Sequence, residues 1–173
     1  MYFNPPLRYI EPLFRPPSEA DSLILQVTNG CSWNQCSFCE MYTQPQKKFK
    51  PRTEAEVLAD IQRCGETMQD VRRVFLADGD AMVLSFRRLE AILQAIRTYL
   101  PNVSRVSSYC LPQNIAHKTP EQLQTLRELG LSLVYIGAES GDDTVLQKVQ
   151  KSETLASTRD AILKLKAAGI KTS

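Results

Sequence analysis

An alternation of short apolar segments with longer amphipathic ones constrains the fold of this chain more than any other feature. A short run rich in Val, Ile and Leu suits a strand that is buried on both faces, whereas apolar residues recurring every three or four positions suit a helix with one buried face. Strands are expected at residues 22–28, 73–77, 103–108 and 131–136, and a fifth begins at Ile170.

The amphipathic segments begin with residues that helices prefer at their N-termini. Thr53 and Glu56 form the pattern of a capping box, and Thr119 and Gln122 repeat it. Ser85 is a further candidate cap, placed directly before a helical pattern of Leu and Ile. In a capping box the two side chains satisfy backbone N–H groups that the first turn of a helix leaves unpaired. Helices are therefore expected to follow the first three strands.

A strand followed by a helix, four times over, predicts an α/β fold with a parallel sheet. We expect a partial (β/α) barrel, similar to a TIM barrel, with about four βα units and the start of a fifth strand. Because the chain stops three residues after Ile170, residues 22–173 are expected to be the N-terminal part of a longer barrel whose C-terminal strands are missing. Residues 1–21 hold five of the ten prolines, which predicts an extended arm on the surface.

Composition excludes several classes of protein. With 43% hydrophobic and 23% charged residues the chain is an ordinary globular one. A net charge of +2 gives no evident nucleic-acid surface. No apolar run approaches the roughly 18 residues of a membrane span, and the N-terminus does not have the pattern of a secretory signal. A cytoplasmic location, with no membrane partner, is expected, and disulfides among the five cysteines are not.

Three cysteines lie close together in a segment without regular period, residues 30–50, which is expected to be a long loop. Cys31, Cys36 and Cys39 have the spacing C-x4-C-x2-C, and thiolates suit iron–sulfur clusters and zinc. No second Cys pair or nearby His completes a four-ligand zinc site, whereas a four-iron cluster on three cysteines keeps one iron open. A non-catalytic module, with zinc or an electron-transfer cluster, remains the alternative. Cys64 and Cys110 are interpreted as structural thiols.

Residues 29–42, with Phe38 directly before the last cysteine, resemble the cluster loop of the radical S-adenosylmethionine (radical SAM) superfamily. They are similar to the branch that shares its core domain with Elongator-type and methylthiotransferase-type enzymes. The resemblance runs from about residue 22 to the end of the chain. The commonest spacing in that superfamily is C-x3-C-x2-C, so the first gap here is one residue longer. The resemblance implies a [4Fe–4S] cluster and S-adenosylmethionine as cofactors.

Cofactor-binding residues are implied at the ends of the later strands, because barrel active sites lie at the C-terminal edge of the sheet. Gly79 and Asp80 stand where the superfamily has a Gly-Gly-Glu-like turn that holds the methionyl amine, although aspartates replace the first Gly and the Glu. Ser108, at the end of the third strand, would face the methionyl carboxylate. The alternative for Ser108 is a strand end that bonds its own turn.

The fourth strand ends in a Gly-Ala-Glu-Ser sequence that matches a superfamily motif. In that motif the acid reaches the ribose hydroxyls of the cofactor, which assigns Glu139 and Ser140 to cofactor binding. The alternative is an ordinary helix-capping turn. Phe38 would pack near the adenine, with a core aromatic as the alternative.

The resemblance implies a radical SAM enzyme with no catalytic residues beyond the cofactor ligands. In that chemistry a reduced cluster cleaves S-adenosylmethionine to a 5′-deoxyadenosyl radical, which abstracts hydrogen from a substrate that is unknown here. An electron donor of flavodoxin or ferredoxin type is expected. The basic run Lys47, Lys48, Lys50 and Arg52 is interpreted as solvated, with contact to an anionic substrate or to the donor as the alternative. The missing strands leave open whether this part of a barrel is active.

Overall fold

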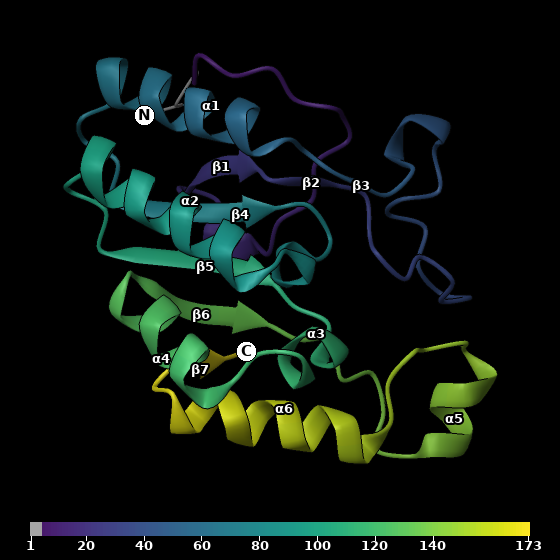
Figure 1. The fold of residues 1–173 in the computed structure, drawn as a ribbon. Helices are drawn as coiled ribbons and strands as arrows, with labels where there is room; N and C mark the ends of the chain where they lie inside the picture. The colour runs from purple at the N-terminus through teal and green to yellow at the C-terminus, as the bar shows by residue number, and fades with distance from the viewer. Residues whose placement is uncertain (1–4) are drawn as a thin grey trace.

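Five parallel strands organise the molecule, and their order across the sheet is their order along the chain (Figure 1). The computed structural model describes residues 5–173. The strands of this sheet are β1 (Leu23–Gln26), β4 (Arg73–Ala77), β5 (Arg105–Tyr109), β6 (Leu131–Tyr135) and β7 (Lys171–Thr172). The predicted α/β fold, with four βα units and the start of a fifth strand, is confirmed.

Helices connect the strands and cover one face of the sheet (Figure 1). The longer ones are α1 (Glu54–Thr67), α2 (Phe86–Tyr99), α4 (Pro120–Glu128) and α6 (Leu155–Ala167). The short ones are α3 (Pro112–Ala116) and α5 (Asp143–Lys148), with 3-10 turns η1 (Pro17–Glu19), η2 (Pro45–Lys47) and η3 (Ala81–Val83). The predicted caps at Thr53, Ser85 and Thr119 are present. None of the helices within residues 5–173 is long and apolar enough to cross a membrane.

The main core lies between the sheet and these helices. Val74, Leu76, Val106 and Val134 point to the helix side and are almost wholly buried there. Side chains alternate between the two faces of a strand, so their neighbours Phe75, Ser107 and Tyr135 point to the opposite face. There Phe75, Tyr109 and Tyr135 form an edge-to-face aromatic cluster.

The first predicted strand is interrupted. β1 ends at Gln26, and Thr28–Asn29 (β2) pairs antiparallel with Lys50–Pro51 (β3) instead of continuing in the main sheet. This small ladder closes the base of the loop that carries the three cysteines. The expected loop over 30–50 is therefore confirmed, and it contains one 3-10 turn, η2.

The N-terminal arm runs first beside α1 and the edge strand β1, where the Tyr9 hydroxyl donates to the Ile24 carbonyl at 2.9 Å, and then reaches the face of the sheet opposite the helices (Figure 1). Its residues 5–16 form no helix or strand, as expected, and residues 1–4 lie outside the described part. The Ile10 N–H donates to Gln26 Oε1 at 2.9 Å, and Glu19 is completely buried beneath Arg105 and Tyr135. Polar groups on that face of the sheet thus bind the arm, while its described residues other than Glu19 stay exposed or half-exposed on the surface.

Replacing Glu19 with glutamine is expected to lower the free energy of unfolding by about 2 kcal/mol at neutral pH, because the ion pair with Arg105 is lost. Burial raises the pKa of Glu19, but hydrogen bonds from the neighbouring Ser, Tyr and Arg side chains outweigh burial and hold that pKa below its usual 4.5. A group whose pKa is lowered on folding stabilises the fold above its unfolded pKa and loses that contribution as the pH falls.

Urea unfolding of both proteins across a series of pH values checks this prediction. The advantage of the wild type should be constant near neutral pH and should shrink as the pH falls below about 4.5, the usual pKa of a glutamic acid. An advantage that persists unchanged in acid would show that the charge of Glu19 is not what stabilises the arm.

Candidate metal centre

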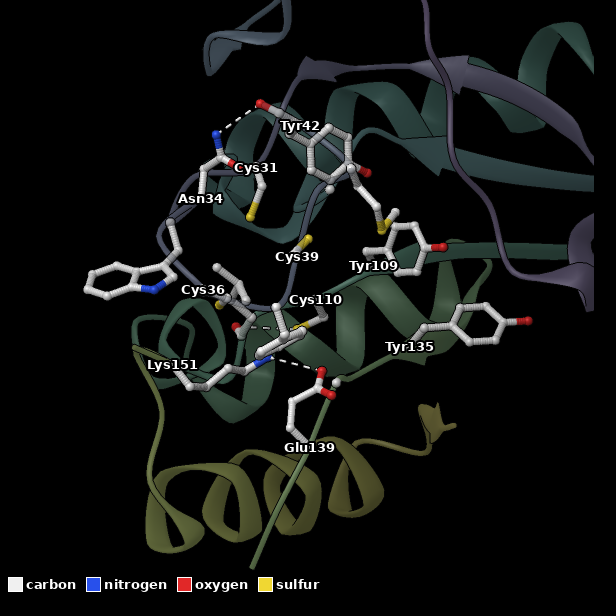
Figure 2. Close-up of a pocket in the computed structure, with 16 residues that line it drawn as sticks. Cys31, Asn34, Cys36, Cys39, Tyr42, Tyr109, Cys110, Tyr135, Glu139 and Lys151 are labelled. Carbon is white, nitrogen blue, oxygen red and sulfur yellow. Dashed lines mark hydrogen bonds and ion pairs between the residues drawn. The ribbon is translucent and has the colours of Figure 1, made fainter. Parts of the chain in front are cut away.

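A cavity of about 180 Å³ opens at the C-terminal edge of the sheet. The cysteine loop forms one wall, and the segments that follow β4, β5 and β6 form the other. Figure 2 shows the three cysteines around this space, with Tyr109, Glu139 and Lys151 facing it from the strand ends and beyond. Of the predicted site residues, the three cysteines, Phe38, Gly79 and Glu139 line the cavity. Asp80, Ser108 and Ser140 do not.

The cysteine loop is held in place from two sides. Its base is closed by the β2–β3 ladder. Its tip is tied to the turn after α5, because the Ser37 N–H donates to the Val149 carbonyl at 3.0 Å and Trp33 Nε1 donates to the Gln150 carbonyl at 2.8 Å. These bonds place a loop without regular secondary structure over the strand ends.

All three cysteines of the loop are free and half-buried. Burial raises the pKa of the Cys31 and Cys36 thiols, and the Lys151 cation acts in the opposite direction on Cys36. Binding of a metal centre deprotonates such thiols, because thiolates are the ligands. Among residues 5–173, no three His, Cys, Asp or Glu side chains converge closely enough to hold a single metal ion.

Gly79 lets the cysteine loop approach the end of β4. A Cβ atom at this position would lie 2.6 Å from the Tyr42 ring and 3.0 Å from Cys31 Cβ. Tyr42 is buried and packs edge-on against Phe14 of the arm, with 5.4 Å between the ring centroids. The missing side chain of Gly79 is therefore what allows Cys31 to sit directly above the turn.

Asp80 lies behind the cavity wall and not on it. Its carboxylate accepts hydrogen bonds from Ser32 Oγ at 2.6 Å, Asn114 Nδ2 at 2.5 Å and the Leu111 N–H at 3.3 Å. Burial raises its pKa to about 6, against the effect of these hydrogen bonds. The carboxylate thus fastens the cysteine loop to the start of α3. Its predicted pairing with an ammonium group stays a prediction.

At the end of β5 the cavity receives Tyr109 where Ser108 was expected. Ser108 is aligned with Leu76 and Val134 on the neighbouring strands, so it points toward the helices. Tyr109, one residue later, points to the other face and lines the cavity. Among the described residues, the buried Ser108 hydroxyl has no hydrogen-bond partner.

After β6, Glu139 and Ser140 diverge. Glu139 has a positive φ of 62° and pairs with Lys151, with 3.6 Å between Oε1 and Nζ. Ser140 accepts a hydrogen bond from the Asp142 N–H at 3.0 Å and lines a separate hollow beside α6. Lys151 was missed from the sequence, because it lies between two helices and belongs to no motif. Phe38 is 49% exposed, at the rim of the cavity.

This donor set fits an iron–sulfur cluster. Three thiols approach the cavity from one loop, and the remaining wall carries a carboxylate, an ammonium and aromatic rings. Thiolate ligands select soft metal centres. Cys31, Cys36 and Cys39 would hold such a centre, and Glu139 and Lys151 line the same cavity as charged groups.

The family model for the "Radical SAM superfamily" matches residues 25–173, which is most of the chain. The chain belongs to the radical SAM superfamily. A [4Fe–4S] cluster and S-adenosylmethionine are the cofactors of this superfamily, so both predicted cofactors are confirmed at the level of the family.

Two curated relatives are heme chaperones. The chain is 24% identical over 119 residues to the heme chaperone HemW of Bacillus subtilis, covering 66% of this chain and 31% of that protein. It is 22% identical over 102 residues to HemW of Lactococcus lactis, covering 59% of this chain and 27% of that protein. The chain therefore spans less than a third of the length of these relatives.

Solved radical SAM structures share the fold. The cobalamin-dependent S-adenosylmethionine radical enzyme OxsB matches with a TM-score of 0.69 and 19% identity, over 87% of this chain and 23% of that chain. The methyltransferase TsrM from Kitasatospora setae, with cobalamin and a [4Fe–4S] cluster bound, matches with a TM-score of 0.64 and 21% identity, over 87% and 30% of the two chains. At these identities the likeness concerns the fold alone.

Proposed function

We propose that this chain holds a [4Fe–4S] cluster on Cys31, Cys36 and Cys39 and cleaves S-adenosylmethionine to start a radical reaction. The observation that carries the proposal is that three free, half-buried thiols of one loop line a single cavity at the C-terminal edge of a parallel sheet. When bound and reduced, the cluster would supply the electron that yields a 5′-deoxyadenosyl radical, which removes a hydrogen atom from the substrate.

The residues of the chain would bind and orient the cofactor. Lys151 and Glu139 place a cation and a carboxylate at the cavity, where they can face a carboxylate and hydroxyl groups of S-adenosylmethionine. Gly79 lines the same cavity, so its backbone would border a bound molecule. Tyr109 and Tyr135 also line the cavity, where their rings would help to exclude water once the cofactor is bound.

The reaction needs an electron from outside the chain, and we propose a donor of flavodoxin or ferredoxin type. Cys36 is half-buried and Phe38 is exposed, and both line the cavity. A donor that docks there would be separated from the cluster by little protein. The substrate remains an unidentified hydrogen donor.

Electron paramagnetic resonance tests the proposal. The full chain is reconstituted anaerobically with iron and sulfide and reduced, and spectra are recorded with S-adenosylmethionine, with S-adenosylhomocysteine and with neither. We expect a [4Fe–4S]⁺ signal whose g-values change with S-adenosylmethionine, together with 5′-deoxyadenosine in the reaction mixture. A cluster signal whose g-values do not change with S-adenosylmethionine would overturn the assignment as a radical SAM enzyme and favour an electron-transfer module. Protein that retains zinc and takes up no iron would overturn both the enzyme assignment and the electron-transfer alternative.

A further inference from the structure

Lys47 is a charged residue in the interior of this protein. Its side chain has no solvent exposure, although the neighbouring Lys48 and Lys50 are exposed. A buried ammonium needs compensating partners. Lys47 Nζ forms an ion pair with Asp78, which is equally buried, and donates to the Ile10 carbonyl at 2.8 Å. It also lies 5.7 Å from the centroid of the Tyr42 ring, a cation–π contact. The expectation that this basic run is solvated is therefore wrong for Lys47.

The ion pair holds Asp78, which directly precedes the predicted cofactor-binding residues Gly79 and Asp80. Besides Lys47, Asp78 Oδ2 accepts from Gln26 Nε2 at 3.1 Å and from the Gly30 N–H at 3.4 Å. The Asp78 N–H donates to Thr28 Oγ1 at 3.2 Å. Asp78 thus links the end of β1, the small β2–β3 ladder and the first residue of the cysteine loop.

A displacement of Asp78 would move Cys31 as well, because the residues between them are tightly packed. Gly79, the next residue, is packed so closely against the Tyr42 ring and Cys31 that a Cβ atom would not fit. Tyr42 in turn lies beneath the Lys47 ammonium. The turn, the ring and the cysteine are therefore held as one packed unit, with the ion pair at its centre.

The N-terminal arm completes this unit from the other face of the sheet. The Ile10 carbonyl accepts from Lys47 Nζ and also from Gln26 Nε2 at 3.2 Å, while Phe14 packs on Tyr42. Stability alone does not require such an arrangement. Replacing a buried ion pair by apolar side chains of similar volume is often neutral or stabilising. The charged groups instead fix the relative positions of the segments, because each hydrogen bond joins one segment to another.

We propose that Lys47 is a positioning residue that couples the N-terminal arm to the cofactor site, by holding Asp78 and through it the Asp78–Asp80 turn and Cys31 in the geometry that receives S-adenosylmethionine. The proposal rests on the proposed function for its consequence, the binding of the cofactor. Its structural half, the ordering of the arm and the cysteine loop by one ammonium group, can be tested without any cofactor.

The experiment compares Lys47→Met with Lys48→Met, the matched change at the exposed neighbour, in the full chain. Hydrogen–deuterium exchange on the apoprotein should show faster exchange in residues 5–16, 28–42 and 78–80 for Lys47→Met only. After reconstitution, Lys47→Met should bind S-adenosylmethionine at least tenfold more weakly and lose most of the spectral response to it. Lys47→Arg, which keeps the charge, should restore part of that response.

The double variant Lys47→Met/Asp78→Leu separates an effect on the position of the loop from an effect on the stability of the fold. It also replaces Lys47→Met in the experiment if that variant does not fold. It should melt near the wild-type temperature and still show fast exchange in the loop and weak cofactor binding. Wild-type exchange in Lys47→Met, or wild-type cofactor binding in the double variant, would overturn the proposal. If the wild type takes up no cluster but the exchange pattern changes as described, the proposed function fails and the ordering role of Lys47 stands.

Discussion

Replacing Cys36 with alanine is expected to abolish cluster binding and, with it, all reductive cleavage of S-adenosylmethionine. Cys36 is one of three thiols available to the cluster in the cavity loop. Two remaining thiols on a loop without regular secondary structure cannot retain a four-iron cluster against loss to solvent and chelators. Removal of a ligand also removes the metal-binding free energy that orders the loop. Iron and sulfide analysis after anaerobic reconstitution, with 5′-deoxyadenosine quantified by chromatography, measures both effects.

Cys64 offers the matched control for this change. It is a free thiol on the buried face of α1, and it does not line the cavity. Cys64→Ala should lower the free energy of unfolding by about 1 kcal/mol through the small cavity it leaves and keep a full complement of iron. If Cys36→Ala retains as much iron as Cys64→Ala, the assignment of the cluster to this loop is wrong.

The fold was predictable because its signals are local. A capping pair such as Thr53 and Glu56 lies within one helical turn, and a buried strand such as 73–77 can be predicted from the apolar composition of its own residues. The order of parallel strands then follows from short right-handed crossovers. The three cysteines were also within reach, since their spacing alone brings them onto one loop.

The rest of the site depends on details that local signals do not carry. The third strand was expected to end at Ser108 and ends at Tyr109. Because side chains alternate with a period of two, an error of one residue exchanges the group that faces the cavity for the one that faces the core. Lys151 contacts Glu139 only because the turn after α5 folds back over the strand ends.

Lys47 illustrates the same limit for charge patterns. Its partner Asp78 is 31 residues away, and its second partner, Ile10, is 37 residues away in the opposite direction. The sequence therefore predicts that a run of basic residues is solvated, since no residue near the run indicates a buried carboxylate partner. The burial of Lys47 follows from the tertiary fold, in which the arm, the loop and the end of β4 meet.

The turn after β4 should be the most sterically sensitive point of the site outside the cysteines. Gly79→Ala places a methyl group 2.6 Å from Tyr42 Cε2 and 3.0 Å from Cys31 Cβ, so the ring and the loop must move. Overpacking of this kind costs about 1–3 kcal/mol of folding free energy. We expect iron content to fall by at least half and the affinity for S-adenosylmethionine to fall by at least tenfold, measured by metal analysis and by titration of the EPR change.

Gly141→Ala is the matched control, because a Cβ atom there meets nothing within 4 Å. It should leave iron content and cofactor affinity at wild-type values. The double variant Gly79→Ala/Tyr42→Leu tests the mechanism, since a smaller side chain at position 42 makes room for the new methyl group. Partial recovery of iron content would show that the clash with the ring displaces the loop, as expected for residues in contact whose effects are not additive. If Gly79→Ala equals Gly141→Ala in every measurement, close packing of the turn against Cys31 is not a condition for building the site.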